Sequence, residues 1–230
     1  RTPAPGTRED EELAAGFLLT EGLIRTAADI HRIEHCRSSE NDNVVHVIPS
    51  PNVPIDLTRL TRHVFASSSC GLCGKASIES VQQQFEPLPR EDGEMRVRAD
   101  RLADWAERLR TAQPVFAQTG GLHAAALFDM HGAIVACRED VGRHNAVDKV
   151  LGHALLHDRL PLDRHVLMVS GRASFEIVQK ALAARIPILA AVSAPSSLAV
   201  DFADANGQTL VGFVRPGRMN IYTQPQRIDL

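Results

Sequence analysis

Residues 166–192 read VLMVSGRASFEIVQKALAARIPILAAV. The stretch begins with a fully apolar run at 166–169 and closes with a second one at 188–192, each of strand length. Between the two runs, residues 175–185 have the spacing of a helix. Apolar strands joined by a helix are typical of parallel strands that are covered on both faces of a sheet.

The same pattern continues on both sides of this stretch. Upstream, residues 122–128 and 133–137 read as two strands of a hairpin, and 143–156 reads as a helix. Downstream, residues 196–205 read as a helix and 210–214 as the last long strand. A hairpin followed by repeated helix–strand units predicts an α/β fold, a three-layer α/β/α sandwich with central parallel strands.

The first part of the chain predicts a smaller α+β unit. Residues 7–22 read as a helix, and two strands separated by a polar turn follow within 29–48. Two prolines make 86–90 a linker. We therefore expect an N-terminal α+β unit at 1–90 and an α/β domain at 91–230. The first carries a Cys-x-x-Cys loop, and we expect the second to bind a ligand.

Composition excludes several classes of protein. The net charge of −3 gives no overall attraction to nucleic acid or membranes, and only 4% of residues are aromatic, too few for a base-stacking single-strand binder. No apolar run reaches the length of a transmembrane helix. Four cysteines in 230 residues do not make a disulfide scaffold. The chain begins at Arg1 without the shape of a signal peptide, so we expect a trimmed N-terminus and a cytoplasmic protein.

Cys70 and Cys73 are the candidate chemical groups. Three serines precede them and a glycine follows each, so we expect an exposed loop rather than a core. Residues 76–85 read as a helix, whose N-terminal dipole, together with Lys75, would lower the pKa of a nearby thiol. The pair fits a persulfide carrier, a dithiol redox pair, half of a zinc site or loop cysteines without chemistry. No second pair of ligands follows at short spacing, which favours reactive thiols over zinc.

Two loops follow the apolar strands and predict an anion site. Residues 170–174 and 193–197 fall where ligands collect in open parallel sheets, at the carboxyl ends of strands. Gly171, Arg172 and Ser193 are the candidate binding residues, because helix N-termini and arginine suit phosphate. The alternative is two ordinary turns with serine caps.

The segment Phe213-Val214-Arg215-Pro216-Gly217-Arg218 places two arginines on either side of a Pro-Gly turn. Such a turn fits a clamp for a nucleotide diphosphate, and it fits a solvated turn equally well. His123 follows a Gly-Gly turn into a strand, and His144 lies at the start of the helix expected at 143–156. A lone histidine is more often structural, so neither receives a role from the sequence.

Four motifs together resemble the formate dehydrogenase accessory sulfurtransferase family. They are Ser68-Ser69-Cys70-Gly71-Leu72-Cys73-Gly74, Thr119-Gly120-Gly121-Leu122-His123-Ala124-Ala125, Glu139-Asp140-Val141-Gly142-Arg143-His144-Asn145-Ala146-Val147-Asp148-Lys149 and Ser170-Gly171-Arg172. The resemblance runs from about Thr7 to Ile228 in the family's order.

The resemblance implies a sulfurtransferase, a homodimer and a fold similar to cytidine deaminases. Such a protein takes persulfide sulfur from a cysteine desulfurase and passes it to the molybdenum of bis(molybdopterin guanine dinucleotide), before that cofactor enters formate dehydrogenase. By this resemblance Cys70 carries the persulfide and Cys73 assists. The same resemblance implies that the 213–218 segment binds the cofactor, and we expect the guanine phosphates to lie near Arg172, Arg215 and Arg218.

Other activities are weighed against this one. Deamination is not expected, because His123-Ala124-Ala125 lacks the glutamate of His-x-Glu and the Cys-x-x-Cys comes too early and lacks a proline. We expect no permanently bound metal and no nucleic acid or membrane partner. Two alternatives stay open: a chaperone that binds the molybdenum cofactor without handling sulfur, and a zinc-stabilised scaffold.

Overall fold

The structure is a computed structural model that describes residues 8–36, 44–51, 53–56, 85–90 and 95–230. Cys70, Cys73 and residues 76–84 of the helix expected at 76–85 lie outside the described residues. Within the described part, none of the helices combines the length and the apolar composition needed to cross a membrane.

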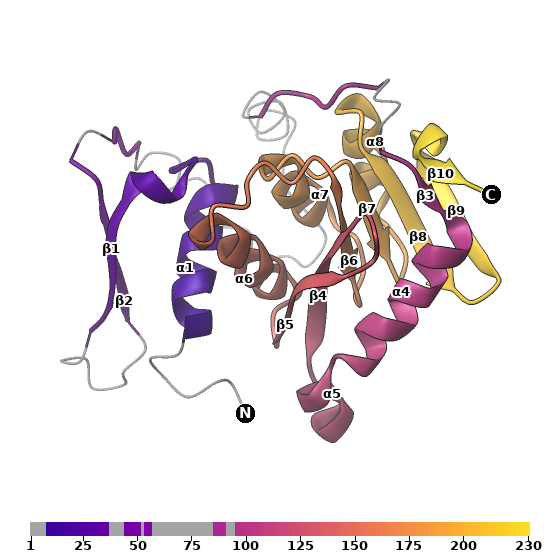
Figure 1. Ribbon diagram of the computed structural model, residues 1–230, viewed down its shortest axis with the longest axis horizontal. Helices are drawn as coiled ribbons and strands as arrows, with labels where there is room; N and C mark the ends of the chain where they lie inside the picture. The colour runs from indigo at the N-terminus through magenta and orange to yellow at the C-terminus, as the bar shows by residue number, and fades with distance from the viewer. Residues whose placement is uncertain (1–7, 37–43, 52, 57–84, 91–94) are drawn as a thin grey trace.

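The body of the described chain is a six-stranded sheet with the strand order β5-β4-β6-β7-β8-β9 (Figure 1). β6, β7 and β8 run parallel to one another, and the other neighbours are antiparallel. In sheet order, the strands span Ile134–Asp140, His123–Asp129, His165–Val169, Ile188–Ala191, Thr209–Arg215 and Arg218–Thr223. The predicted hairpin with central parallel strands is confirmed.

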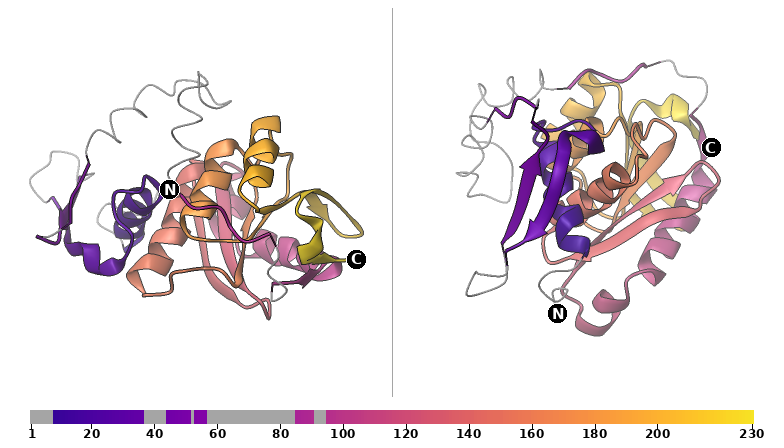
Figure 2. Two further views of the ribbon diagram at one scale, coloured as in Figure 1. Left: turned by 90° about the horizontal axis from the view of Figure 1, so that it is seen from above. Right: turned by 60° about the vertical axis from the view of Figure 1, so that its left-hand side comes forward.

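Helices cover both faces of this sheet (Figure 2). One face carries α6, α7 and α8, and the other carries α4, which α5 follows in the chain. These helices span Arg143–Leu156, Phe175–Ala183, Ser197–Ala205, Ala99–Thr111 and Pro114–Thr119. The mixed α/β class is therefore confirmed, whereas the likeness to cytidine deaminases stays a prediction.

Successive side chains of a strand point to opposite faces of the sheet, and both faces are buried here, which explains why the central strands are wholly apolar. In β6, Leu167 and Val169 belong to the core under α6 and α7, whereas Val166 and Met168 belong to the core under α4. Both sets are buried, because each face of the sheet has its own layer of helices.

The layer under α4 has an aromatic centre. Leu102, Trp105 and Leu109 recur at helical spacing and are buried. Trp105 stacks on Phe128 of β4 with ring centroids 5.1 Å apart. This contact holds α4 against the sheet on the side that later forms one wall of a cavity.

On the opposite side, α1 (Arg8–Thr20) packs on α6 through two glycines. A Cβ at Gly16 would lie 1.8 Å from the carbonyl oxygen of Asp148, and a Cβ at Gly152 would lie 1.8 Å from the carbonyl oxygen of Glu12. The two helix backbones are therefore in direct contact, which only glycine allows.

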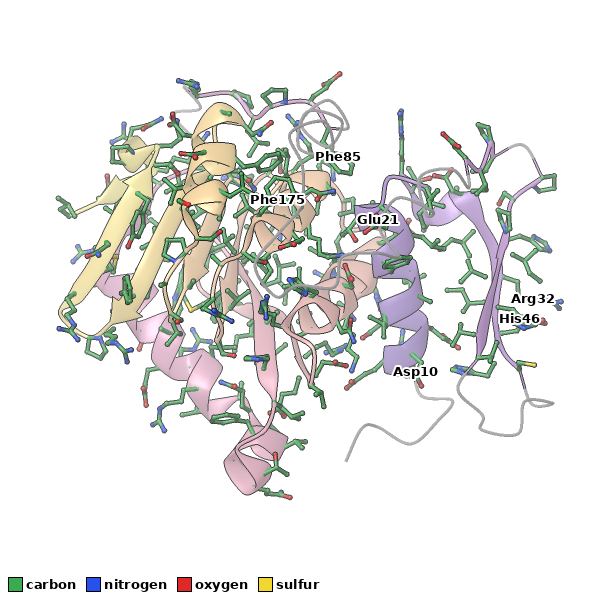
Figure 3. All side chains as sticks on the ribbon, turned by 180° about the vertical axis from the view of Figure 1, so that it is seen from behind. Asp10, Glu21, Arg32, His46, Phe85 and Phe175 are labelled. Carbon is green, nitrogen blue, oxygen red and sulfur yellow. The ribbon has the colours of Figure 1, made fainter. Side chains whose placement is uncertain are left out.

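Beyond α1 lies a two-stranded antiparallel ribbon of β1 (Ile30–His35) and β2 (Val45–Pro49), preceded by the 3-10 helix η1 (Ala27–Asp29). Figure 3 shows Arg32 and His46 on the side of the ribbon that faces away from α1. The two strands expected within 29–48 are confirmed, and the division of the chain at residue 90 stays a prediction.

The end of the chain differs from the expectation. We expected 210–214 to be the last long strand, but the chain turns after Arg215 and returns as β9. As an edge strand, β9 is only partly buried, so its residues carry a weak apolar signal. The chain then closes with η2 (Pro225–Arg227) and β10 (Ile228–Asp229), which pairs in parallel with β3 (Val97–Arg98).

Candidate functional site

Backbone hydrogen bonds join the loops at the carboxyl edge of the parallel strands. The N–H of Ala173 donates to the carbonyl of Ala194 at 3.2 Å, and the N–H of Ser196 donates back to Ala173 at 3.0 Å. The N–H of Phe213 donates to the carbonyl of Ser193 at 3.2 Å. The three segments expected to bind an anion therefore form one continuous rim.

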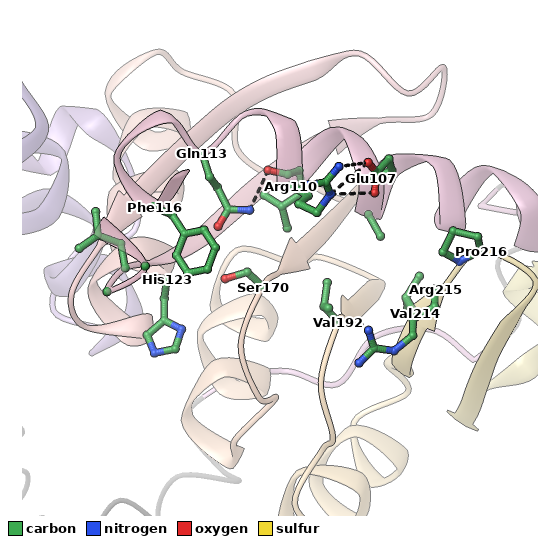
Figure 4. Close-up of a pocket in the computed structure, with 15 residues that line it drawn as sticks. Glu107, Arg110, Gln113, Phe116, His123, Ser170, Val192, Val214, Arg215 and Pro216 are labelled. Carbon is green, nitrogen blue, oxygen red and sulfur yellow. Dashed lines mark hydrogen bonds and ion pairs between the residues drawn. The ribbon is translucent and has the colours of Figure 1, made fainter. Parts of the chain in front are cut away.

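A cavity opens beside this rim. Its volume of about 490 Å³ is within the usual range for small-molecule sites. Figure 4 shows Phe116 and His123 at one end of the cavity and Arg215 and Pro216 at the other. Its lining comes from α4, α5, the Gly-Gly turn and the ends of β6, β7 and β8: Ala106, Glu107, Leu109, Arg110, Gln113, Phe116, Gly120, Gly121, Leu122, His123, Ser170, Val192, Val214, Arg215 and Pro216.

Three predicted arginines of the rim present unpaired charge. Arg172, Arg215 and Arg218 are exposed, and no hydrogen bond or ion pair joins their side chains to another described residue. Arg215 and Arg218 face each other across the β8–β9 turn, where Gly217 has a φ of 77° that favours glycine. The guanidinium groups are therefore free to bind an anionic ligand.

Phe213 has an unusual backbone in the middle of the predicted 213–218 segment. Its φ is 53°, a left-handed conformation that a bulky residue rarely adopts. The register of β8 against β9 shifts between Gly212 and Arg215, and this bulge leaves the Phe213 side chain 39% exposed. Such a strained, exposed aromatic residue beside a cavity is typical of a ligand-binding segment.

Gly171 and Ser193 occupy the rim without lining the cavity itself. Gly171 is buried and Ser193 is half-buried. The hydroxyl of the neighbouring Ser170 accepts a hydrogen bond from the N–H of Ala124 at 2.8 Å, which ties β6 to the start of β4. Of the predicted binding residues, Val214, Arg215 and Pro216 line the cavity directly.

His144 has a structural partner. Its Nε2 lies 3.1 Å from the hydroxyl of Ser174, the N-cap of α7, and 3.8 Å from a carboxylate oxygen of Glu176. Burial, with help from Arg143, lowers the pKa of His144 to about 4. His144 is therefore neutral at pH 7 and connects α6 to α7.

Several polar residues of the 139–149 motif make contacts that stabilise the fold, and they do not line the cavity. The N-cap of α6 is Gly142, whose N–H donates to a carboxylate oxygen of Asp140 at 2.8 Å. The other carboxylate oxygen of Asp140 lies 2.7 Å from the ammonium of Lys149, which is 2% exposed. Glu139 accepts hydrogen bonds from the first N–H groups of α5, at 2.7 and 2.9 Å.

The α4–α5 wall of the cavity was missed by the sequence interpretation. Gln113 donates to the carbonyl of Leu109 at 2.9 Å, and Arg110 is paired with Glu107. Phe116 is 40% exposed and faces the cavity from α5. An aromatic residue between Pro114 and a Gly-Gly turn was the available signal, although it lies in a helix too short to show periodicity.

Within the described residues, no group of three or more His, Cys, Asp or Glu side chains could hold a metal ion. Cys137 in β5 is a free thiol whose pKa is raised to about 11, mainly by burial and also by Glu139. Because the thiolate is the nucleophile, Cys137 is unreactive near neutral pH.

Known proteins match this chain along nearly its whole length. "Sulfur carrier protein FdhD" of Streptomyces coelicolor is 52% identical over 235 residues, covering 100% of this chain and 82% of the relative. The protein of the same name from Mycobacterium tuberculosis is 52% identical, covering 99% and 84%. A crystal structure of "a putative formate dehydrogenase accessory protein from Desulfotalea psychrophila" superposes with a TM-score of 0.72 at 29% identity, covering 96% of this chain and 80% of that one.

The family profile described as "FdhD/NarQ family" matches residues 5–229. This match agrees with the four motifs that suggested the resemblance, and it includes the loops that form the rim of the cavity. The chain therefore belongs to the FdhD/NarQ family.

Proposed function

We propose that this protein is a sulfur carrier that delivers persulfide sulfur to the molybdenum cofactor of formate dehydrogenase. The names of the relatives support the sulfur-carrier role, and the name of the structural neighbour supports formate dehydrogenase as the client. The chain acts as a sulfurtransferase, and bis(molybdopterin guanine dinucleotide) is its substrate.

Cys70 is the proposed carrier. Its thiolate attacks the outer sulfur of the persulfide on a cysteine desulfurase, so that a new S–S bond forms on Cys70. The S–S bond of the donor breaks, and the desulfurase cysteine leaves as a thiolate. The Cys73 thiolate then attacks Sγ of Cys70, so that a Cys70–Cys73 disulfide forms and the outer sulfur leaves as sulfide, the form that molybdenum takes up. A cellular thiol reduces the disulfide before the next cycle. Cys137 is unsuited to this chemistry because its pKa is raised to about 11.

The observation that carries the proposal is the arginine-bearing rim beside the cavity. Arg172 comes from the loop after β6, and Arg215 and Arg218 come from the turn between β8 and β9. None of the three has a partner among the described residues. A cofactor with two pyrophosphate groups needs several such cations, because guanidinium binds phosphate through paired hydrogen bonds. Phe116 offers an aromatic surface to a purine ring in the same cavity.

Chain length allows Cys70 to reach both a donor and the cavity. Ile55 and Phe85 both pack against the main core, on either side of the segment that contains the two cysteines. Cys70 lies about 15 residues from each, and an extended chain of that length spans up to about 50 Å. This reach is comparable with the diameter of a globular domain of this size. The homodimer and the cytoplasmic location stay predictions.

The test is intact-protein mass spectrometry after incubation with a cysteine desulfurase and cysteine. We expect wild type to gain a sulfur atom that reductant removes, and Cys70→Ala to gain none. Cys137→Ser is the matched control and should gain sulfur as wild type does, because its thiol stays protonated near pH 7.

The cellular counterpart is formate dehydrogenase activity in a strain that carries only the variant protein. Loss of activity with Cys70→Ala is expected. Full activity with Cys70→Ala and Cys73→Ala, together with intact cofactor binding, would instead identify a cofactor chaperone that does not handle sulfur.

A further inference from the structure

A cationic side chain beside the cavity lacks a described acceptor. Arg143 is the first residue of α6 and is half-buried. Its Nε is buried without a hydrogen-bond partner, and no described residue accepts a bond from the rest of the guanidinium. An unpaired buried donor is unfavourable, because it has lost its hydrogen bonds to water without gaining another acceptor. Arg143 is therefore poised to bind an acceptor that a ligand supplies.

Gly171 separates Arg143 from a second basic side chain. A Cβ at position 171 would lie 3.2 Å from Nδ1 of His123 and 3.8 Å from Cδ of Arg143. His123 lines the cavity, so this gap adjoins the cavity end that Figure 4 shows at His123. Because residue 171 has no side chain, no side-chain atom fills the position between the imidazole and the arginine, and the 3.2 Å separation from Nδ1 suits a single hydrogen-bonded ligand oxygen.

The surroundings of this gap are basic. Burial first, and then the charges of Arg143 and Arg172, hold the pKa of His123 below its ordinary value. Nearby acids already have partners, since Asp140 binds Lys149 and Glu176 faces His144. An anionic group that entered the gap would meet two guanidinium groups and an imidazole that can donate a hydrogen bond.

We propose that Arg143 and His123, on either side of Gly171, form an oxyanion subsite that binds a phosphoryl group of the ligand in the cavity. The subsite deepens the cofactor-binding half of the proposed function and is independent of the sulfur-transfer step. A guanidinium matches two phosphate oxygens in one plane, and the His123 ring supplies a further N–H. Arg215, at the other end of the cavity, leaves room for a second phosphoryl group.

Calorimetric titration with inorganic pyrophosphate, guanosine diphosphate and guanosine tests the subsite. Arg143→Ala should weaken both phosphate-bearing probes by about tenfold or more, because a hydrogen bond to a charged group contributes about 1.5–3 kcal/mol. Binding of guanosine should not change. Gly171→Ala should also weaken the two phosphate-bearing probes, because its methyl group fills the gap.

Two further variants distinguish a specific hydrogen-bonded contact of Arg143 with phosphate from the general effect of one positive charge on binding. Arg159 is exposed just beyond the other end of α6, about 20 Å away, so Arg159→Ala removes the same charge and should bind as wild type. Arg143→Lys keeps the charge without the planar fork and should still bind pyrophosphate more weakly than wild type. This variant also covers the case in which Arg143→Ala fails to fold.

Wild-type affinity in either Arg143 variant would overturn the subsite, and so would an equal loss in Arg159→Ala. Absence of pyrophosphate and guanosine diphosphate binding by wild type would overturn it as well. Sulfur loading by the desulfurase is measured separately, so it distinguishes failure of this inference from failure of the sulfur-carrier function.

Discussion

At the residue scale, His144 couples protonation to stability. In the unfolded chain its pKa is about 6.5, and in the folded protein it is about 4, because burial and then Arg143 disfavour the charged ring. Between these two pH values the unfolded state binds more protons than the folded state. Stability therefore rises with pH across this window and falls as the pH drops from about 6.5 to 4.

The prediction is tested by urea unfolding of wild type and His144→Gln at several pH values. We expect the variant to lose less stability than wild type between pH 6.5 and 4, since it has no ring to protonate. Some slope should remain, because burial also lowers the pKa values of His153 and His165. Identical slopes for the two proteins would contradict this account of His144.

At the scale of elements, the α1–α6 contact depends on Gly16. Helix propensity alone predicts that Gly16→Ala stabilises the protein by up to about 1 kcal/mol. The new Cβ, however, would lie 1.8 Å from a backbone oxygen of α6, which cannot move aside as a side chain does. We therefore expect Gly16→Ala to destabilise the protein by about 3 kcal/mol, measured by urea unfolding.

Gly121→Ala is the matched control for this variant. The nearest atom to a Cβ at Gly121 is the carbonyl oxygen of Thr119 at 4.0 Å, so the substitution has space. Its free energy of unfolding should lie within about 0.5 kcal/mol of wild type. A Gly16→Ala protein that is more stable than wild type would show that the two helices separate without cost.

At the scale of the whole molecule, a buried ion pair joins three helices. The ammonium of Lys180 in α7 lies 2.9 Å from both carboxylate oxygens of Asp148 in α6. The hydroxyl of Thr20, the last residue of α1, donates to Asp148 and accepts from Lys180, both at 2.9 Å. Burial raises the pKa of Asp148, while Lys180 and Thr20 oppose that rise.

Removing one partner of this pair should cost more than removing both. Lys180→Met leaves Asp148, which is 2% exposed, without its cation. We expect a loss of about 3–5 kcal/mol in the free energy of unfolding, and recovery of most of it in Lys180→Met/Asp148→Leu. The four proteins of this double-mutant cycle are compared by urea unfolding. A loss below about 1 kcal/mol in the single variant would contradict this account, because it would show that the pair contributes no more than an exposed salt bridge does.

The main elements of the fold were predictable because their signals are local. The apolar strands β6 and β7 and the helix at 143–156 follow from hydrophobic runs and periodicity within a few residues. The position of the rim followed as well, since loops after parallel strands meet at one edge of the sheet. The motifs carried enough information to identify the family, including the two cysteines outside the described residues.

Other features depend on contacts between residues far apart in the chain. Glu139 caps α5 and Lys149 is buried beside Asp140, although both residues read locally as polar groups near a helix start. The α5 wall of the cavity and the unpaired state of Arg143 likewise become visible only when distant segments meet. Local sequence therefore specified the strands, the helices and the chemical groups. Only the tertiary structure decided which polar side chains stabilise the fold and which are left to bind a ligand. The physical reason is that burial and hydrogen-bond partners are properties of the folded chain.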